Sequence, residues 1–208
     1  MSIQDFFEAL KASILQTDFI TWAATVTAIA YVVFAAYENI LCWPAGIISS
    51  GLSVMVYVNT SLINEAFLNV IYCFLGIYGW YIWRKSKGDE KKRTGERSIS
   101  RMKRQYFQLA VLLSFVTGLL LGYITHYFHY STFPYSDSLI TIFSITATWM
   151  TAEKYIENWI LWIAADFAAA IVYFIKGPEL YLFGILFIFY TIISVKGFIT
   201  WKKTLSEE

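Results

Sequence analysis

The chain has 208 residues, of which 58% are hydrophobic and 15% are charged, and its formal net charge is +1. The mean hydropathy is +0.54. Soluble globular domains carry about 25% charged residues, so this composition excludes an ordinary soluble domain and indicates a membrane protein.

The first 16 residues predict a short amphipathic helix on the membrane surface. Ile3, Phe6, Phe7, Leu10 and Ile14 recur at helical spacing, with polar residues between them. A frayed terminus is the alternative interpretation of this segment.

Seven later windows are long and apolar enough to cross about 30 Å of hydrocarbon. They are residues 19–37, 40–59, 66–83, 107–127, 136–152, 159–175 and 179–201. Backbone groups must be satisfied inside each segment in lipid, so each window predicts a helix. A β-barrel would need alternating apolar and polar positions, which these windows lack.

Two parts of the chain repeat each other. Glu38-Asn39-x3-Trp43 recurs as Glu157-Asn158-x3-Trp162, 119 residues later. Further motifs recur as well: Thr17-Asp18 as Ser136-Asp137, and Tyr72-x6-Gly79-x3-Trp83 as Tyr190-x6-Gly197-x3-Trp201 at an offset of 118. Duplicated membrane units commonly build transporters with the substrate site between the halves.

The repeat predicts an all-α integral membrane protein with seven transmembrane helices in a 3+1+3 arrangement. The fourth helix has no counterpart and reverses the second unit, so the two units are expected to be parallel. The predicted parts are the N-terminal helix (1–16), the first repeat (17–83), a basic loop (84–105), the linker helix (106–130) and the second repeat with a tail (131–208).

Positive charges predict the orientation. The segment from Arg84 to Arg104 holds ten of the sixteen Lys and Arg residues, and loops 60–65 and 128–135 hold none. Basic loops stay in the cytoplasm, so the N-terminus is expected outside and the C-terminus inside.

The candidate substrate site combines residues of both repeats. Its members are Asn39, Trp43, Tyr72, Trp149, Asn158, Trp162, Asp166, Tyr173 and Tyr190. Indole faces stack on aromatic rings and attract cations, and carboxamides match a carboxamide or a ribose diol.

Simpler structural roles compete with these assignments. Glu38 and Glu157 are expected to cap helices, and Trp43 and Trp162 fit an interfacial aromatic belt as well. Asp166 is different because it lies within an apolar span, where an ionisable group costs about 3 kcal/mol and usually marks a functional pathway.

Cofactors and enzymatic motifs are not expected. Cys42 and Cys73 lie in separate predicted helices, which indicates neither a disulfide framework nor a metal site. The sequence holds no Walker, zinc-protease or serine-hydrolase motif.

The paired Glu-Asn-x3-Trp elements, Trp43-Pro44-x-Gly46 and Asn158-x3-Trp162-x3-Asp166-x6-Tyr173 resemble the PnuC family of bacterial vitamin transporters. The resemblance spans residues 18–201, and the layout is also similar to that of SWEET sugar transporters. It implies a bacterial inner-membrane homotrimer that imports nicotinamide riboside by facilitated diffusion. A cytoplasmic kinase would trap the product.

Other functions remain open. Related PnuC-like carriers transport thiamin or riboflavin, which one sequence separates poorly from nicotinamide riboside. An ion-coupled symporter with Asp166 as its ion site is the second class, and an intramembrane receptor or enzyme is the third.

Overall fold

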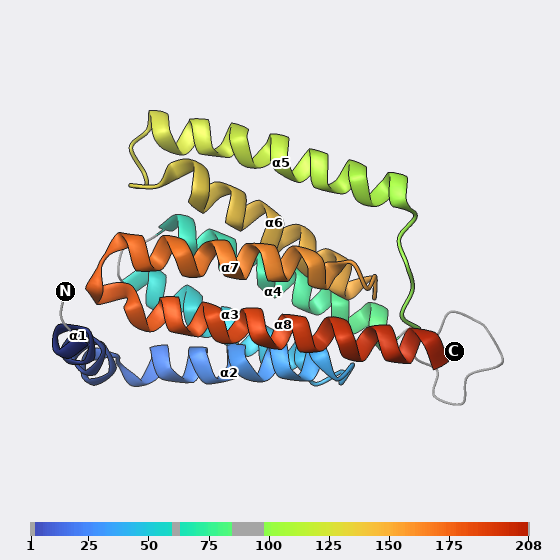
Figure 1. Ribbon diagram of the computed structural model, residues 1–208, viewed down its shortest axis with the longest axis horizontal. Coiled ribbons are helices and arrows are strands. Elements are labelled where there is room, and N and C mark those ends of the chain that lie inside the picture. The colour runs from blue at the N-terminus through green and yellow to red at the C-terminus, as the bar shows by residue number, and fades with distance from the viewer. Residues whose placement is uncertain (1–2, 60–62, 85–97, 208) are drawn as a thin grey trace.

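The computed structural model describes residues 3–59, 63–84 and 98–207, and these residues form a bundle of helices (Figure 1). The α-helices are α1 (Ile3–Gln16), α2 (Phe19–Ala36), α3 (Cys42–Asn59), α4 (Ile63–Arg84), α5 (Arg104–Tyr127), α6 (Pro134–Ala152), α7 (Asn158–Lys176) and α8 (Tyr181–Glu207). The predicted all-α class is confirmed for these residues. Residues 85–97 of the predicted basic loop lie outside them.

Five of the described helices are long and apolar enough to cross a bilayer: α2, α4 from Glu65 onward, α5, α7 and α8. α3 and α6 have 18 and 19 residues. They fall outside this group of five; α6 holds seven Ser and Thr residues, and α3 holds three Ser residues. Several of these hydroxyl groups line a cavity.

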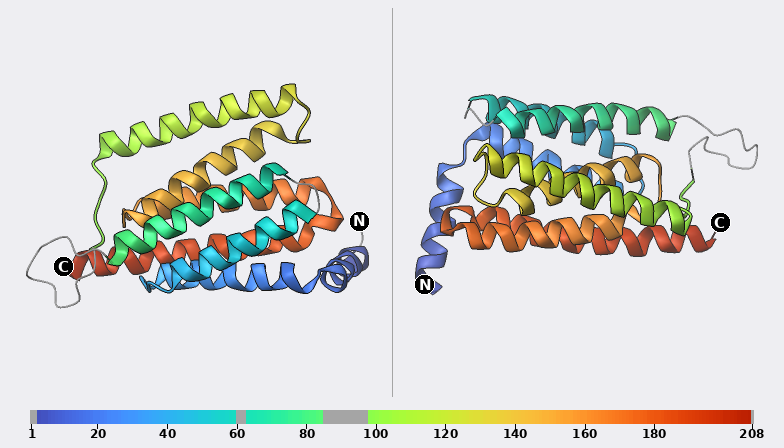
Figure 2. Two further views of the ribbon diagram at one scale, coloured as in Figure 1. Left: turned by 180° about the vertical axis from the view of Figure 1, so that it is seen from behind. Right: turned by 90° about the horizontal axis from the view of Figure 1, so that it is seen from above.

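α1 crosses the end of the bundle at which α2 begins (Figure 2). It contacts α8 and the short 3-10 helix Pro178–Leu180, and the ring of Phe6 lies 5.4 Å from that of Tyr181. A position on the membrane surface stays a prediction for this helix.

Asp18 fixes the start of α2. Its Oδ1 accepts hydrogen bonds from the backbone N–H groups of Ile20 at 2.8 Å and Thr21 at 3.0 Å, which satisfies donors that a helix N-terminus leaves free. The Thr21 hydroxyl donates to Oδ2 at 2.6 Å. These bonds, the Thr21 hydroxyl first, hold the pKa of the Asp18 carboxyl below its usual value.

The long helices form two similar sets of three. In the first set α3 contacts α2 and α4, and in the second α7 contacts α6 and α8. The sets meet through α2 with α8 and through α4 with α6. Exchanging α2 with α6, α3 with α7 and α4 with α8 therefore reproduces the same pattern of contacts.

The two ends of the bundle differ in charge. We define the basic end by residues 36–42, 84, 98–104, 152–158 and 201–207, where Arg84, Arg101, Lys103, Arg104, Lys154, Lys202 and Lys203 lie. The opposite end holds residues 17–19, 59, 63, 127–134 and 176–181. The C-terminus lies at the basic end and the N-terminus at the opposite end (Figure 1).

The corners between the first and second helix of each set have the same backbone geometry. Glu38 has a φ of 55° and Lys154 a φ of 52°, both in the left-handed region. The N–H of Glu38 donates to the Ala35 carbonyl at 3.1 Å, and the N–H of Lys154 donates to the Thr151 carbonyl at 3.0 Å. The two corners are thus equivalent at an offset of 116 residues, the difference between 154 and 38.

This offset corrects the expected pairing of Trp43 with Trp162. Trp43 corresponds to Trp159, and each packs on a glycine of the third helix in its own set. A Cβ on Gly79 would lie 2.3 Å from Trp43, and one on Gly197 would lie 2.6 Å from Trp159. Gly79 and Gly197, in contrast, are equivalent at the offset of 118 that the sequence indicates.

The prediction that the Glu157 side chain caps α7 is wrong. Its side chain makes no capping bond to α7 and instead accepts from the backbone N–H of Met102 at 3.0 Å. Glu38 forms an ion pair with Lys154 at 3.2 Å, which joins the two corners. Both carboxylates therefore hold separate segments together at the basic end.

α5 lies outside the two sets and packs on α6 (Figure 1). Ser114, Gly118 and Gly122 are its buried residues, four apart on one face. Such small residues allow close approach between helices in a membrane. The Ser114 and Thr146 hydroxyls lie 2.8 Å apart.

Replacing Gly122 with alanine is expected to destabilise the protein by about 1–3 kcal/mol, the usual cost of overpacking. The added Cβ would lie 2.7 Å from a Tyr135 ring carbon and 3.0 Å from its Cα. Gly51→Ala is the matched control, because its Cβ would meet nothing within 4 Å. Thermal unfolding in detergent measures both, and equal melting temperatures for the two variants would contradict this packing.

Candidate functional site

A cavity of about 510 Å³ lies between the two helix sets. Every helix of both sets contributes to its lining, and α5 contributes none of the described lining residues. Ligand pockets typically measure about 300–1,000 Å³, so the space suits a molecule the size of a nucleoside or vitamin.

The cavity opens at the opposite end and is closed at the basic end. Its outer lining includes the partly exposed or exposed residues Glu65, Asp137 and Lys176. Its inner lining includes Trp43 and Trp159, which are 0% and 1% exposed. Among the described lining residues, the exposed ones thus lie toward the opposite end, which is the side from which a ligand could enter.

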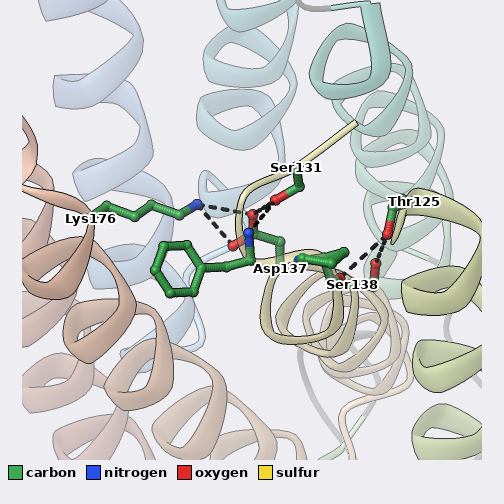
Figure 3. Close-up of polar contacts among 7 residues, drawn as sticks. Thr125, Ser131, Asp137, Ser138 and Lys176 are labelled. Carbon is green, nitrogen blue, oxygen red and sulfur yellow. Dashed lines mark hydrogen bonds and ion pairs between the residues drawn. The ribbon is translucent and has the colours of Figure 1, made fainter. Parts of the chain in front are cut away.

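An ion pair borders the mouth of the cavity (Figure 3). Lys176 Nζ lies 2.9 Å from both carboxylate oxygens of Asp137, and the Ser131 hydroxyl donates to Asp137 at 2.5 Å. Lys176 also lies 5.5 Å from the centre of the Tyr173 ring. The only basic residue among the described lining residues is thus already engaged by a carboxylate.

Hydroxyl groups of α3 and α6 line the walls. These are Ser49, Ser50 and Ser53 of α3 and Thr141, Ser144, Thr148 and Thr151 of α6. Several are engaged by backbone carbonyls: Ser49 donates to Ala24 at 2.9 Å, and Thr148 donates to Ser144 at 2.8 Å. Their oxygens keep lone pairs that can accept from a hydroxylated ligand.

Asp166 supplies a carboxylate deep in the cavity. It is 4% exposed, and its Oδ2 accepts from the Ser194 hydroxyl at 3.1 Å. Tyr72 and Tyr190 line the same cavity. A buried carboxylate that accepts from one hydroxyl keeps further lone pairs for a ligand hydroxyl, and its charge can attract a positive ring.

The structure brings together six of the nine predicted site residues: Trp43, Tyr72, Trp162, Asp166, Tyr173 and Tyr190 all line the cavity. The other three lie elsewhere. Asn39 is exposed and accepts from the Leu41 N–H at 2.9 Å, so it does not share a helical face with Trp43. Trp149 is 37% exposed, outside the lining.

Asn158 is fully buried and acts behind the cavity wall. Its side-chain amide donates to the Tyr155 carbonyl at 2.6 Å, and its Oδ1 accepts from the Thr151 hydroxyl at 3.1 Å. The Trp162 indole N–H donates to the same hydroxyl at 3.3 Å. Asn158 thus positions Trp162 through Thr151.

Sequence reasoning missed Tyr31, Trp159 and the wall hydroxyls. The signal for Trp159 is present in the sequence, because Gly197 and Trp201 repeat Gly79 and Trp83 and each glycine needs a tryptophan against it. The hydroxyl groups carry no such signal, because Ser and Thr are frequent in membrane helices for packing reasons.

Among the residues that the structure describes, no three His, Cys, Asp or Glu side chains gather into a group that could hold a metal ion. The site chemistry rests on aromatic faces, hydroxyls and carboxylates.

Comparisons with known proteins agree with this geometry. A family model described as "Nicotinamide mononucleotide transporter" matches residues 18–203. The chain is 22% identical over 206 residues to the nicotinamide riboside transporter PnuC of Escherichia coli K12, covering 88% of this chain and 84% of that protein. It is 28% identical over 187 residues to PnuC of Neisseria mucosa, covering 86% and 70%.

A crystal structure of the vitamin B3 transporter PnuC has the same fold. The TM-score is 0.72 at 24% identity, and the match covers 99% of this chain and 90% of that one. The named relatives are transporters and not enzymes. With the family model covering most of its length, the chain belongs to the PnuC family of nicotinamide mononucleotide and riboside transporters.

Proposed function

We propose that this protein imports nicotinamide riboside by facilitated diffusion, with trapping by phosphorylation in the cytoplasm. The observation that carries the proposal is the cavity between the helix sets, where the Trp162 ring and the Asp166 carboxylate line one space. The ring offers a stacking face for a pyridinium, and the carboxylate offers an acceptor for a ribose hydroxyl or a partner for the positive ring.

Charge favours the riboside over the mononucleotide. The charged residues of the described lining are Glu65, Asp137, Asp166 and Lys176, and the one cation is bound by Asp137. A phosphate would meet more negative than positive charge here. A cationic nucleoside suits the same lining.

The proposed architecture has seven membrane-crossing helices, α2 to α8, in a 3+1+3 arrangement with α5 as the inverting linker. The equivalent contacts of the two sets support it, and so does the position of α5 outside them. The basic end is proposed to face the cytoplasm, since positive residues are retained there. The cavity then opens to the outside, and a homotrimer in the bacterial inner membrane is part of the same proposal.

The orientation predicts where reporters work. A cytoplasm-active fluorescent reporter fused after Glu208 should be bright, because the C-terminus follows the basic end of α8. An enzyme reporter that needs the outer compartment should be active when fused before Met1. Silence of the C-terminal reporter, with the protein present in membranes, would reverse the orientation.

Substrate binding should depend on Trp162 and Asp166. Trp162→Ala is expected to weaken nicotinamide riboside binding by about 1–3 kcal/mol, the value of base–aromatic stacking. Asp166→Asn is expected to cost about 1.5–3 kcal/mol, the range for hydrogen bonds to charged groups. Calorimetry on purified protein measures both.

Trp149→Ala is the matched control for this measurement, because Trp149 is a tryptophan of the second set that lies outside the cavity lining. Its affinity should equal that of the unmodified protein. Thiamin and riboflavin in the same calorimeter test the alternative vitamins. Tighter binding of either one would replace the proposed substrate.

Transport is expected to be passive. In liposomes, labelled nicotinamide riboside should equilibrate without accumulating, and an enclosed riboside kinase with ATP should produce accumulation. A pH or sodium gradient should change neither the rate nor the end point. Accumulation driven by a gradient, and lost in Asp166→Asn, would instead identify a symporter that binds its ion at Asp166.

A further inference from the structure

Four tryptophans close the cavity at the basic end. Trp43 meets Trp83 at 5.4 Å and Trp159 meets Trp201 at 5.5 Å, each pair edge to face at 90°. Trp83 and Trp201 lie 6.2 Å apart, which joins the pairs. Every one of these rings is at most 2% exposed. We call these four residues the tryptophan closure.

The closure is held by hydrogen bonds that cross between the two sets. The Trp83 indole N–H of the first set lies 3.2 Å from the Thr151 carbonyl and 3.1 Å from the Ala152 carbonyl in the second. The Trp201 indole N–H of the second set donates to the Ala35 carbonyl of the first at 3.0 Å. Opening the basic end requires both sets to give up these bonds.

An ion pair reinforces the same junction. Lys154 is 2% exposed, lies 3.2 Å from Glu38 across the two corners, and sits 4.4 Å from the centre of the Trp83 ring. Separating the sets at this end would leave the buried ammonium without its carboxylate, which is costly. Opening the closure by separating the sets would therefore also break this ion pair.

Thr151 contacts the tryptophan closure and also lines the cavity. Its carbonyl receives the Trp83 indole, while its hydroxyl accepts from the Trp162 indole at 3.3 Å. The same hydroxyl lies 2.8 Å from the Ala147 carbonyl and 3.1 Å from Asn158 Oδ1, either of which can take its single hydrogen. Trp162 and Trp83 thus donate to two different oxygens of the same residue.

The first set has no equivalent link. At the offset of 116, Thr151 corresponds to Ala35 and Trp162 to Gly46. The Ala35 carbonyl still receives Trp201, but alanine offers no hydroxyl to the cavity. A hydroxyl that links a cavity tryptophan to the closure at this position is therefore a feature of the second set.

We propose that Thr151 is a positioning residue that couples occupancy of the cavity to the opening of the tryptophan closure. A ligand stacked on Trp162 alters the hydrogen bond from that indole to the Thr151 hydroxyl. The change displaces Thr151 and so weakens the hydrogen bond from Trp83 to the Thr151 carbonyl. A ligand shifts an equilibrium only by binding its two states differently, and this hydroxyl supplies the difference. The inference rests on the proposed function, because it takes the closure as part of a transport path.

Cys42 provides a built-in reporter of opening. It is 0% exposed and belongs to the same buried cluster as the closure. In a Cys73→Ser background it is the sole cysteine of the chain. The rate at which N-ethylmaleimide alkylates Cys42 in purified protein then measures how often the closure opens.

Without ligand, Thr151→Val should raise the alkylation rate about tenfold, because the Trp162 and Asn158 groups lose a buried partner. Thr151→Ser retains the hydroxyl and should restore the original rate. Thr200→Val is the matched control, since the Thr200 hydroxyl donates along its own helix to the Lys196 carbonyl at 3.0 Å, next to Trp201. Its rate should be unchanged. An unchanged rate in Thr151→Val overturns the proposal.

With saturating nicotinamide riboside, the alkylation rate should rise in the Cys73→Ser protein and stay constant in Thr151→Val. Trp162→Phe is a second variant that keeps a stacking face and leaves Thr151 intact but removes the indole donor. It should bind the riboside more weakly in calorimetry, and at a saturating concentration its alkylation rate should not rise. A rise in either variant equal to that of the Cys73→Ser protein, or no rise in the latter despite binding, overturns the coupling. Absence of binding to the unmodified protein defeats the proposed function instead, and the ligand-free rates then decide the role of Thr151.

Discussion

The carbonyl groups at the C-terminal ends of α2 and α6 are the constraint around which the two helix sets are arranged. A helix leaves its last carbonyls without partners, and in a membrane such groups must be satisfied within the protein. Ala35 and Thr151 receive a turn N–H from their own corner and an indole N–H from the other set. Each set therefore supplies hydrogen-bond donors for the terminal carbonyls of the other. These contacts between the sets close the cavity at one end.

The sequence predicts the helices well, but it misplaces the corner equivalence. The repeated motif Glu-Asn-x3-Trp suggests an offset of 119 between the repeats. The backbone geometry instead makes Glu38 equivalent to Lys154, at an offset of 116. Equivalent positions in facing repeats can carry opposite charges, because these attract each other when the two sets meet. A search for identical residues in the two repeats therefore does not detect that Glu38 and Lys154 are equivalent. Trp83 and Trp201 are aligned correctly by sequence because both need the same partner, a carbonyl.

The candidate site is predictable where a residue conflicts with its surroundings. Asp166 stands out because a carboxylate in an apolar run is costly without a purpose, and it lies in the cavity as expected. The Asn39 side chain accepts a hydrogen bond from the backbone of its own corner. Because an Asn in a corner is not unusual, the sequence does not indicate that Asn39 lies outside the cavity. The role of Thr151 cannot be predicted from the sequence for the same reason. The fold is needed to show that its hydroxyl and carbonyl oxygens accept from Trp162 and Trp83.

The two sets share one backbone pattern but divide their aromatic rings differently. In the first set a Cβ on Gly46 would lie 2.9 Å from the Tyr31 ring, so the aromatic group comes from α2. In the second, Ala147 takes the place of Tyr31 and Trp162 that of Gly46, so the aromatic group comes from α7. At these equivalent positions the large ring thus stands on α2 in the first set and on α7 in the second. The ring on α7 donates its indole N–H to the hydroxyl of Thr151, whose carbonyl also receives Trp83, so two nearly equivalent helix sets contribute different contacts at the closed end of the cavity.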